Sequence, residues 1–185
     1  MAIDIFNPLV DLQNNKMKSA SWYRNAVSLV ADRTSPTELF ASGKLLGKPS
    51  AGRMSMFFYD PKFKARLPYY DIFPLVLPLE TMKGGFIGLN FHYLPYGARF
   101  QFLQQLQRYA SNGKFDQSTR IQASYDSVKS NKYVKASIHR YLWSHVRSQF
   151  LRVNVNEMAL AAYLPVAQFQ GATVGKVFAK SRKTF

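Results

Sequence analysis

The chain has 185 residues and carries 25 Lys and Arg against 10 Asp and Glu, a formal net charge of +15. It has no cysteine, which excludes disulfides and thiolate metal sites, and its apolar runs are too short to span a bilayer. Apolar residues make up 47 % and aromatic residues 15 % of the chain, which is enough for a folded core. The excess positive charge indicates a polyanion or an acidic protein as partner, and it favours binding or assembly over catalysis.

The N-terminal part of the chain predicts an arm followed by two helices. Residues 1–20 are weakly periodic and are expected to form the arm. Apolar residues at helical spacing predict a first helix over 22–33, with Ser21 as its cap. Residues 35–38 (SPTE) have the composition of a capping box with proline at the first helical position, so a short helix should begin there and end at Gly43.

The middle of the chain changes to a strand-like pattern. Residues 54–59, 72–79 and 86–94 are rich in aromatic and aliphatic side chains and predict three strands, joined by links too short for parallel crossovers. Pro74 and Pro78 remove two ladder donors, so the second strand should lie at an edge or a bulge. The expected fold class is α+β, with a small antiparallel sheet or partial barrel over about residues 53–94.

Two amphipathic helices are expected to cover this sheet. The apolar residues return to helical spacing over 96–109, and a second pattern of this kind runs over 132–150. Residues 111–131 are polar and predict a long surface loop. The basic C-terminal tail is expected to order only against a partner. The predicted arm, single α+β domain and tail have these bounds: 1–20, 21–170 and 171–185.

Basic residues concentrate toward the C-terminus, where Glu157 is the only acid after Asp126. Arg140, Trp143 and Arg147 would share one face of the expected 132–150 helix. Bases interleaved with an aromatic ring suit a nucleic-acid backbone and an exposed base, and they equally suit an acidic neighbouring subunit. A solvated face is the plain alternative. The candidate partner- or nucleic-acid-binding residues are Lys132, Lys135, Arg140, Trp143, Arg147, Arg152, Lys176, Lys180, Arg182 and Lys183.

No residue pattern predicts catalysis, a cofactor or a metal. The glycine-rich basic loop at 43–52 lacks the spacing of a phosphate-binding loop. The spacing of the three histidines does not fit a shared metal site, and a metal ion needs three or four protein ligands. Asp60 and Asp71 are most simply turn residues, although the aromatic cluster before Asp71 could bind a ligand. A Ser–His–acid triad stays open because the order of its members in sequence is free, but no nucleophile-elbow motif is present.

Several stretches of the sequence carry a resemblance to a known group of proteins. They are residues 59–80 (YDPKFKARLPYYDIFPLVLPLE), 84–99 (GGFIGLNFHYLPYGAR), 132–154 and 161–172. Together they resemble small virion proteins of contractile-tailed phages of the broad T-even-like type, over most of residues 50–175. The resemblance implies a virion structural, baseplate or DNA-end-binding component, and it implies assembly rather than chemistry.

The leading hypothesis is a non-enzymatic structural subunit of a tailed-phage virion, in the tail baseplate or tail–neck region. It would dock on other virion proteins in a symmetric ring through its basic surface and arms. The first alternative is a virion protein that binds double-stranded DNA and holds or protects genome ends, and the second is a virion-associated hydrolase. The leading hypothesis involves no membrane, cofactor or small-molecule substrate, and it places assembly in the host cytoplasm.

Overall fold

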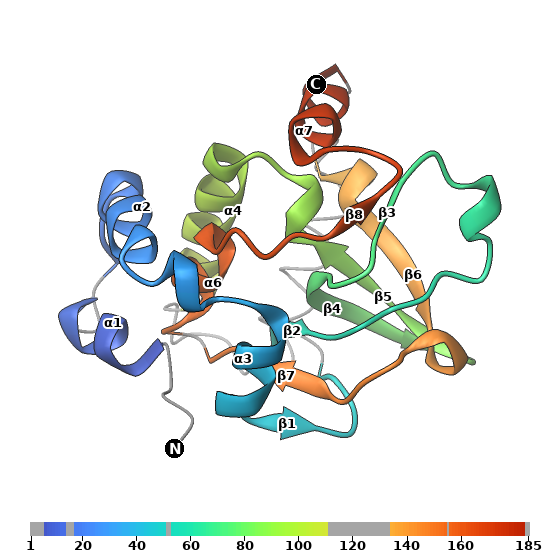
Figure 1. Cartoon of the computed structure of the whole chain (residues 1–185), viewed down its shortest axis with the longest axis horizontal. Helices are drawn as coiled ribbons and strands as arrows, with labels where there is room; N and C mark the ends of the chain where they lie inside the picture. The colour runs from blue at the N-terminus through green and yellow to red at the C-terminus, as the bar shows by residue number, and fades with distance from the viewer. Residues whose placement is uncertain (1–5, 14–16, 51–52, 111–133, 155, 184–185) are drawn as a thin grey trace.

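The computed structural model describes residues 6–13, 17–50, 53–110, 134–154 and 156–183, and it confirms a mixed α+β fold (Figure 1). The α-helices are α1 (Phe6–Gln13), α2 (Ala20–Ser28), α3 (Pro36–Ser42), α4 (Tyr96–Ala110), α6 (Met158–Tyr163) and α7 (Val174–Lys183). The strands are β1 (Leu45–Leu46), β2 (Ser55–Met56), β3 (Tyr70–Asp71), β4 (Leu75–Met82), β5 (Gly85–Asn90), β6 (Ile138–Leu142), β7 (Phe150–Arg152) and β8 (Phe169–Gln170).

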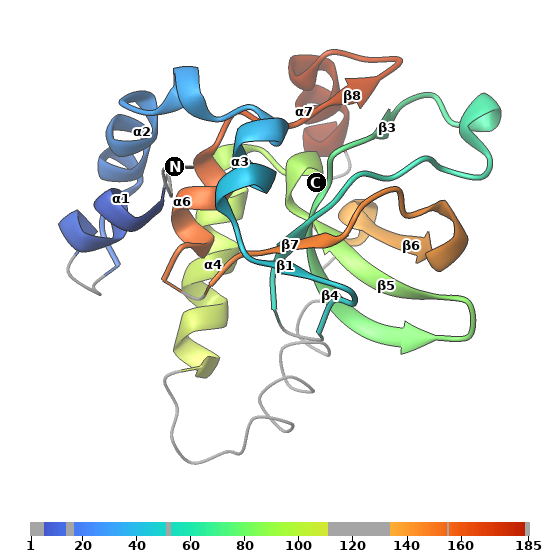
Figure 2. The same ribbon diagram turned by 60° about the horizontal axis from the view of Figure 1, so that its bottom comes forward.

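The main sheet has the order β1-β7-β2-β4-β5-β6, and each pair of neighbours in it is antiparallel. Within the described residues β1 and β6 are its two edges, so the sheet does not close into a barrel. Strands β3 and β8 pair separately. Helices α1, α2, α4 and α6 lie together on one side of the molecule, and β4, β5 and β6 lie on the other side (Figures 1 and 2).

Successive side chains of each strand point to opposite faces of the main sheet, and each face carries its own cluster of buried side chains. One face packs against the helices through residues such as Leu75, Leu77, Leu89 and Leu151. The other face carries a separate, mostly aromatic cluster made of Phe57, Tyr59, Val76, Phe86, Tyr141 and Phe150. This second face is the one on which the candidate site lies.

Strand β4 is a central strand of the sheet, because it pairs with both β2 and β5. The prediction of an edge or a bulge is confirmed as a bulge, since the register between β4 and β5 shifts between Pro78 and Glu80. Gly88 faces Pro78 at this point, and a side chain on Gly88 would collide with Val76 Cγ1. A central strand therefore tolerates proline here because the irregular ladder needs no donor from it.

Two of the local helix signals, the capping box and the apolar period of 96–109, are confirmed. Glu38 N donates to Ser35 Oγ at 3.3 Å and Ser35 N donates to Glu38 Oε2 at 3.1 Å, which completes the capping box of α3. Helix α4 forms where the apolar period predicts it. The cap of α2 is Ser19 rather than Ser21, since Trp22 N donates to Ser19 Oγ at 3.2 Å.

The predicted helix over 132–150 is wrong within the residues that are described. That segment forms a short 3-10 turn (Lys135–Ser137), β6, a second 3-10 turn (Trp143–His145) and the start of β7. Tyr141 and Trp143 therefore point to the same face and pack in the aromatic cluster, although a helix would have separated them. Ile138 packs on the helix side of the sheet. A strand that is buried on both faces has apolar residues at positions that also fit a helical period. Packing against the rest of the protein therefore determines that this segment forms a strand.

Each predicted arm contains a helix packed on the rest of the protein. Phe6 and Leu9 of α1 belong to the main core. Helix α7 occupies residues that the sequence predicted to be an unstructured basic tail. It buries Val177 completely, and its Ser181 Oγ donates to Tyr93 O at 2.7 Å. The amphipathic spacing of a few apolar residues was enough to fold this basic segment. The predicted loop at 111–131 lies outside the described residues.

Candidate nucleic-acid interface

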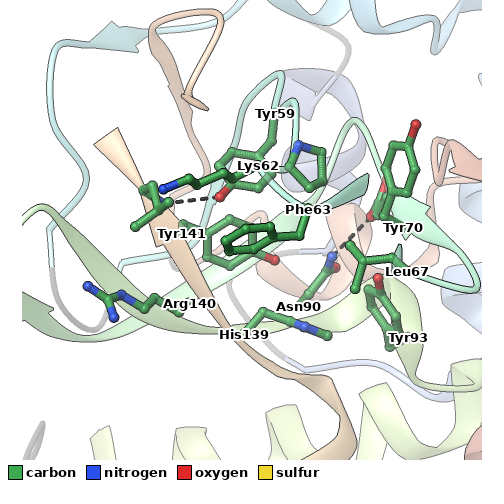
Figure 3. A pocket seen from close by; sticks show the side chains of 13 residues that line it. Tyr59, Lys62, Phe63, Leu67, Tyr70, Asn90, Tyr93, His139, Arg140 and Tyr141 are labelled. Atoms are coloured by element: carbon green, nitrogen blue, oxygen red, sulfur yellow. Dashed lines mark hydrogen bonds between the residues drawn. The ribbon is translucent and has the colours of Figure 1, made fainter. Parts of the chain in front are cut away.

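A pocket of about 440 Å³ opens on the sheet face that carries the aromatic cluster. We call it the aromatic pocket. Strand β6, the end of β5, the 3-10 turn η3 (Phe91–Tyr93) and the segment 59–71 form it together (Figure 3). Its lining residues are Tyr59, Pro61, Lys62, Phe63, Leu67, Tyr70, Asp71, Asn90, Tyr93, His139, Arg140, Tyr141 and Leu142.

A hydrogen-bonded network of buried groups forms the inner end of the pocket. Asp71 Oδ2 accepts from Asn90 Nδ2 at 3.1 Å and from His92 Nδ1 at 2.7 Å, and Asp71 Oδ1 accepts from Phe73 N at 3.0 Å. Asn90 Oδ1 in turn accepts from His92 N at 2.9 Å. Burial lowers the pKa of His92, against the opposing effect of Asp71, so His92 is a neutral hydrogen-bond donor here. The network holds β3, β5 and η3 in one fixed arrangement.

His139 forms part of the pocket wall and is also neutral. Its ring packs on Tyr93 with the centroids 4.4 Å apart. Burial lowers the pKa of His139 to about 4, and Asp71 opposes this shift only in part. Its Nε2 is buried and has no hydrogen-bond partner among the described residues. A protonated His139 would therefore be costly, and His139 adds no charge to the wall at neutral pH.

Arg99 fixes η3 from behind the pocket. Its guanidinium is buried and donates to Leu94 O at 2.8 Å, to Ala162 O at 2.7 Å and to His92 O at 3.3 Å. It also lies 4.5 Å from the ring centroid of Tyr96. Burial lowers the pKa of Arg99 to about 10, so the group remains a cation at neutral pH. Arg99 joins η3 to α4 and α6, and the position of the pocket wall at Tyr93 depends on it.

The mouth of the pocket is apolar and positively charged. Phe63 and Leu67 are 57 % and 43 % exposed and both line the pocket, so the mouth carries exposed apolar surface. Lys62 Nζ lies 5.3 Å and Arg66 Cζ lies 5.9 Å from the ring centroid of Phe63, within the range of a cation–π contact. On the opposite wall Arg140 is exposed and donates to Lys83 O at 3.4 Å.

Asp60 lies beside the mouth and offsets part of this charge. Its Oδ1 is 2.8 Å from Lys64 Nζ, and its Oδ2 is 3.6 Å from Arg147 Nη2. The hydrogen bond from Lys64 is the main cause that lowers the pKa of Asp60, so the carboxylate is ionised at neutral pH. His145 Nδ1 donates to Asp60 O at 2.8 Å, which holds the backbone at this point.

The structure brings together part of the predicted binding set. Arg140 lines the pocket with Tyr59, and Arg147 pairs with the neighbouring Asp60 at 3.6 Å. Lys180 on α7 has its Nζ 5.3 Å from the ring centroid of Tyr69, which packs on Tyr93 of the pocket wall. These three cations therefore border one region, although the helix face that predicted two of them does not exist.

The other predicted residues lie elsewhere or have other contacts. The half-buried ring of Trp143 packs on Phe86, with the centroids 5.0 Å apart, so much of it serves the aromatic cluster. Arg152 is half-buried on β7, near the opposite edge of the sheet from β6. Lys135 and Lys176 are exposed. Lys132 and the side chains of Arg182 and Lys183 lie outside the part of the structure that is described.

Sequence reasoning missed Lys62, Phe63 and Arg66 as a group. They belong to the short link between the strands predicted at 54–59 and 72–79, for which no binding role is predicted. An aromatic residue between cations at 62–66 (KFKAR) is the signal that could have identified them. Asp71 was interpreted as a turn residue, but the structure places it in the buried network with His92.

The described residues show no arrangement for a metal or a membrane span. No cluster of three or more His, Asp or Glu in them could hold a metal ion. Every helix in the same ranges is too short or too polar to cross a bilayer.

Comparison with known protein families identifies the family to which this chain belongs. The chain matches the model of the phage T4 terminal DNA protecting protein over residues 11–184, and it therefore belongs to that family. Neither the curated proteins nor the solved structures give a match. The resemblance to T-even-like phage virion proteins is confirmed. The match favours the DNA-end alternative over the tail baseplate or tail–neck hypothesis, which it does not support.

Proposed function

We propose that this protein binds the ends of double-stranded DNA in a phage virion and protects them, as a binding protein without catalytic activity. The family match over residues 11–184 is the observation that carries the proposal. The net charge of +15 supports it, because duplex DNA presents a dense row of phosphates and attracts a basic protein over long range. Docking on other virion proteins in a ring, and assembly in the host cytoplasm, are compatible with this role and remain predictions.

The phosphate-binding surface that we propose surrounds the aromatic pocket. Lys62 and Arg66 lie on one side of its mouth, Arg140 lies on the other, and Lys180 borders the wall above Tyr69. Exposed cations on several elements suit a duplex backbone, since phosphate contacts fix position without reading sequence.

The test compares linear duplex DNA with a duplex of the same sequence whose two ends are closed by hairpin loops. We expect tighter binding to the linear form and protection of its ends from an added exonuclease. We also expect the logarithm of the affinity to fall linearly with the logarithm of the salt concentration. Equal binding to open and closed ends, or no protection from the exonuclease, would contradict the proposal.

A charge-reversal pair locates the surface. The double variant Arg140→Glu, Arg147→Glu should weaken DNA binding and reduce the salt slope while its circular dichroism stays that of the wild type, since both side chains are exposed. Lys44→Glu, Lys48→Glu is the matched control, because it makes the same charge change beside β1 at the other edge of the sheet. Equal losses in both variants would show that the charge acts in bulk and that the surface is wrongly placed.

A further inference from the structure

We propose that the aromatic pocket receives an unpaired nucleobase from the terminus of the bound DNA, with the adjoining phosphates held at its mouth. This inference rests on the proposed DNA-end function and adds the ligand class of one site. A duplex end differs from the rest of a duplex because its last bases can leave the stack at lower cost. A protein that recognises ends without reading sequence can use this difference.

The aromatic side chains at the pocket point to a flat, apolar ligand. The exposed ring of Phe63 stands at the mouth, and Tyr70, Tyr93 and Tyr141 contribute rings from β3, η3 and β6. Phe63 and Leu67 are both exposed and line the same pocket, and apolar side chains that gather on a surface mark an interaction site, whereas single ones do not. Aromatic rings beside cations are the common device for stacking single-stranded bases.

Several polar groups inside the pocket already have partners within the protein, although His139 Nε2 on its wall has none among the described residues. Tyr59 Oη accepts from Leu142 N at 3.1 Å, and the Asn90 side chain bonds both Asp71 and the backbone of His92. Few groups are therefore left to read the edge of a particular base. Recognition by the ring face alone should accept all four bases, which is the selectivity that protection of arbitrary ends requires.

The charges of the pocket orient such a ligand. Asp71 is the only acid among the lining residues, and it lies at the buried inner end. The lining cations Lys62 and Arg140 are both exposed. A phosphate would be repelled from the inner end and attracted to the mouth, whereas an uncharged base can enter. The volume of about 440 Å³ lies in the usual range for small ligands, about 300 to 1,000 Å³.

The test uses duplexes that carry the fluorescent base 2-aminopurine, either as a one-nucleotide overhang or at an internal paired position. Stacking on an aromatic ring quenches this base. We expect the wild-type protein to quench the overhanging base and not the internal one. Phe63→Ala should abolish this quenching and lower the affinity for the overhang duplex by about 5- to 150-fold, as loss of one base–aromatic stack does.

Leu29→Ala is the matched control, because Leu29 is also an exposed apolar residue, 72 % exposed, but lies beyond α2 on the helical side. It should behave as the wild type. Both variants should keep wild-type salt dependence on closed-end duplexes. Replacing the overhanging base by each natural base in turn should change the affinity little.

The outcomes separate this inference from the function on which it rests. If the wild-type protein protects ends but leaves the overhanging base unquenched, the pocket assignment is wrong and the proposed function survives. If the protein neither prefers nor protects ends, both fall. If Phe63→Ala keeps the quenching and the affinity for the overhang duplex but loses binding to another virion protein, the pocket is a protein-docking site and the inference is overturned.

Discussion

Replacing Asp60 by asparagine should strengthen DNA binding. In the structure the Asp60 carboxylate contacts Lys64 Nζ at 2.8 Å and Arg147 Nη2 at 3.6 Å, so it competes with DNA phosphates for two cations beside the aromatic pocket. Asparagine has nearly the same shape and removes one negative charge. If one additional phosphate is neutralised, the slope of log affinity against log salt should steepen by about 0.9. The ratio of the affinity at 50 mM salt to that at 200 mM salt should then rise about 3.5-fold over the wild type.

The assay is a titration of linear duplex at several salt concentrations, with Asp32→Asn as the matched control. Asp32 is an exposed acid in the 3-10 turn after α2, so the control makes the same change in net charge away from the pocket. It should steepen the slope much less than Asp60→Asn does. Unchanged or weaker binding by Asp60→Asn, with an unchanged fold by circular dichroism, would refute the idea that cations beside this pocket contact DNA.

Two further predictions concern stability. Arg99→Met should lower the free energy of unfolding by about 3 to 5 kcal/mol in urea titrations, because three buried carbonyls lose their donor. Arg53→Met is the control, since Arg53 is exposed. A loss below about 1 kcal/mol for Arg99→Met would contradict the prediction. Burial lowers the pKa of His139 from 6.5 in the unfolded chain to about 4 in the folded protein. The unfolded chain therefore binds a proton first as the pH falls from 6.5 to 4, and the free energy of unfolding should drop over this range by up to about 3 kcal/mol. His139→Phe should flatten this part of the pH dependence, and equal slopes for wild type and variant would contradict it.

Local signals in the sequence predicted the parts of the fold that short-range chemistry decides. The Ser35–Glu38 capping box forms because both hydrogen bonds join residues three apart, whatever the rest of the chain does. The bulge at Pro78 follows from a missing donor in the same way. The nature of residues 138–142 did not follow, because a strand buried on both faces has no polar side to reveal its period.

The site was harder to predict than the charge that surrounds it. Its walls come from segments far apart in sequence, and they meet because β5 pairs with β6 in a register that sets Gly88 opposite His139. No local pattern encodes that register. The sequence identified Arg140, Arg147 and Lys180 as candidate cations, but it grouped the first two on a helix that the chain does not form.

The shortage of acids also shapes how the fold holds its own cations. Arg99 is held by three carbonyls and the ring of Tyr96, and Lys180 and Lys62 lie over the rings of Tyr69 and Phe63. Rings and carbonyls position a cation without cancelling its charge, whereas a carboxylate would do both. The positive potential of these groups therefore persists around the aromatic pocket, where a DNA end would meet it. Asp60 lowers this positive potential locally, because its carboxylate pairs with Lys64 and Arg147 beside the pocket mouth.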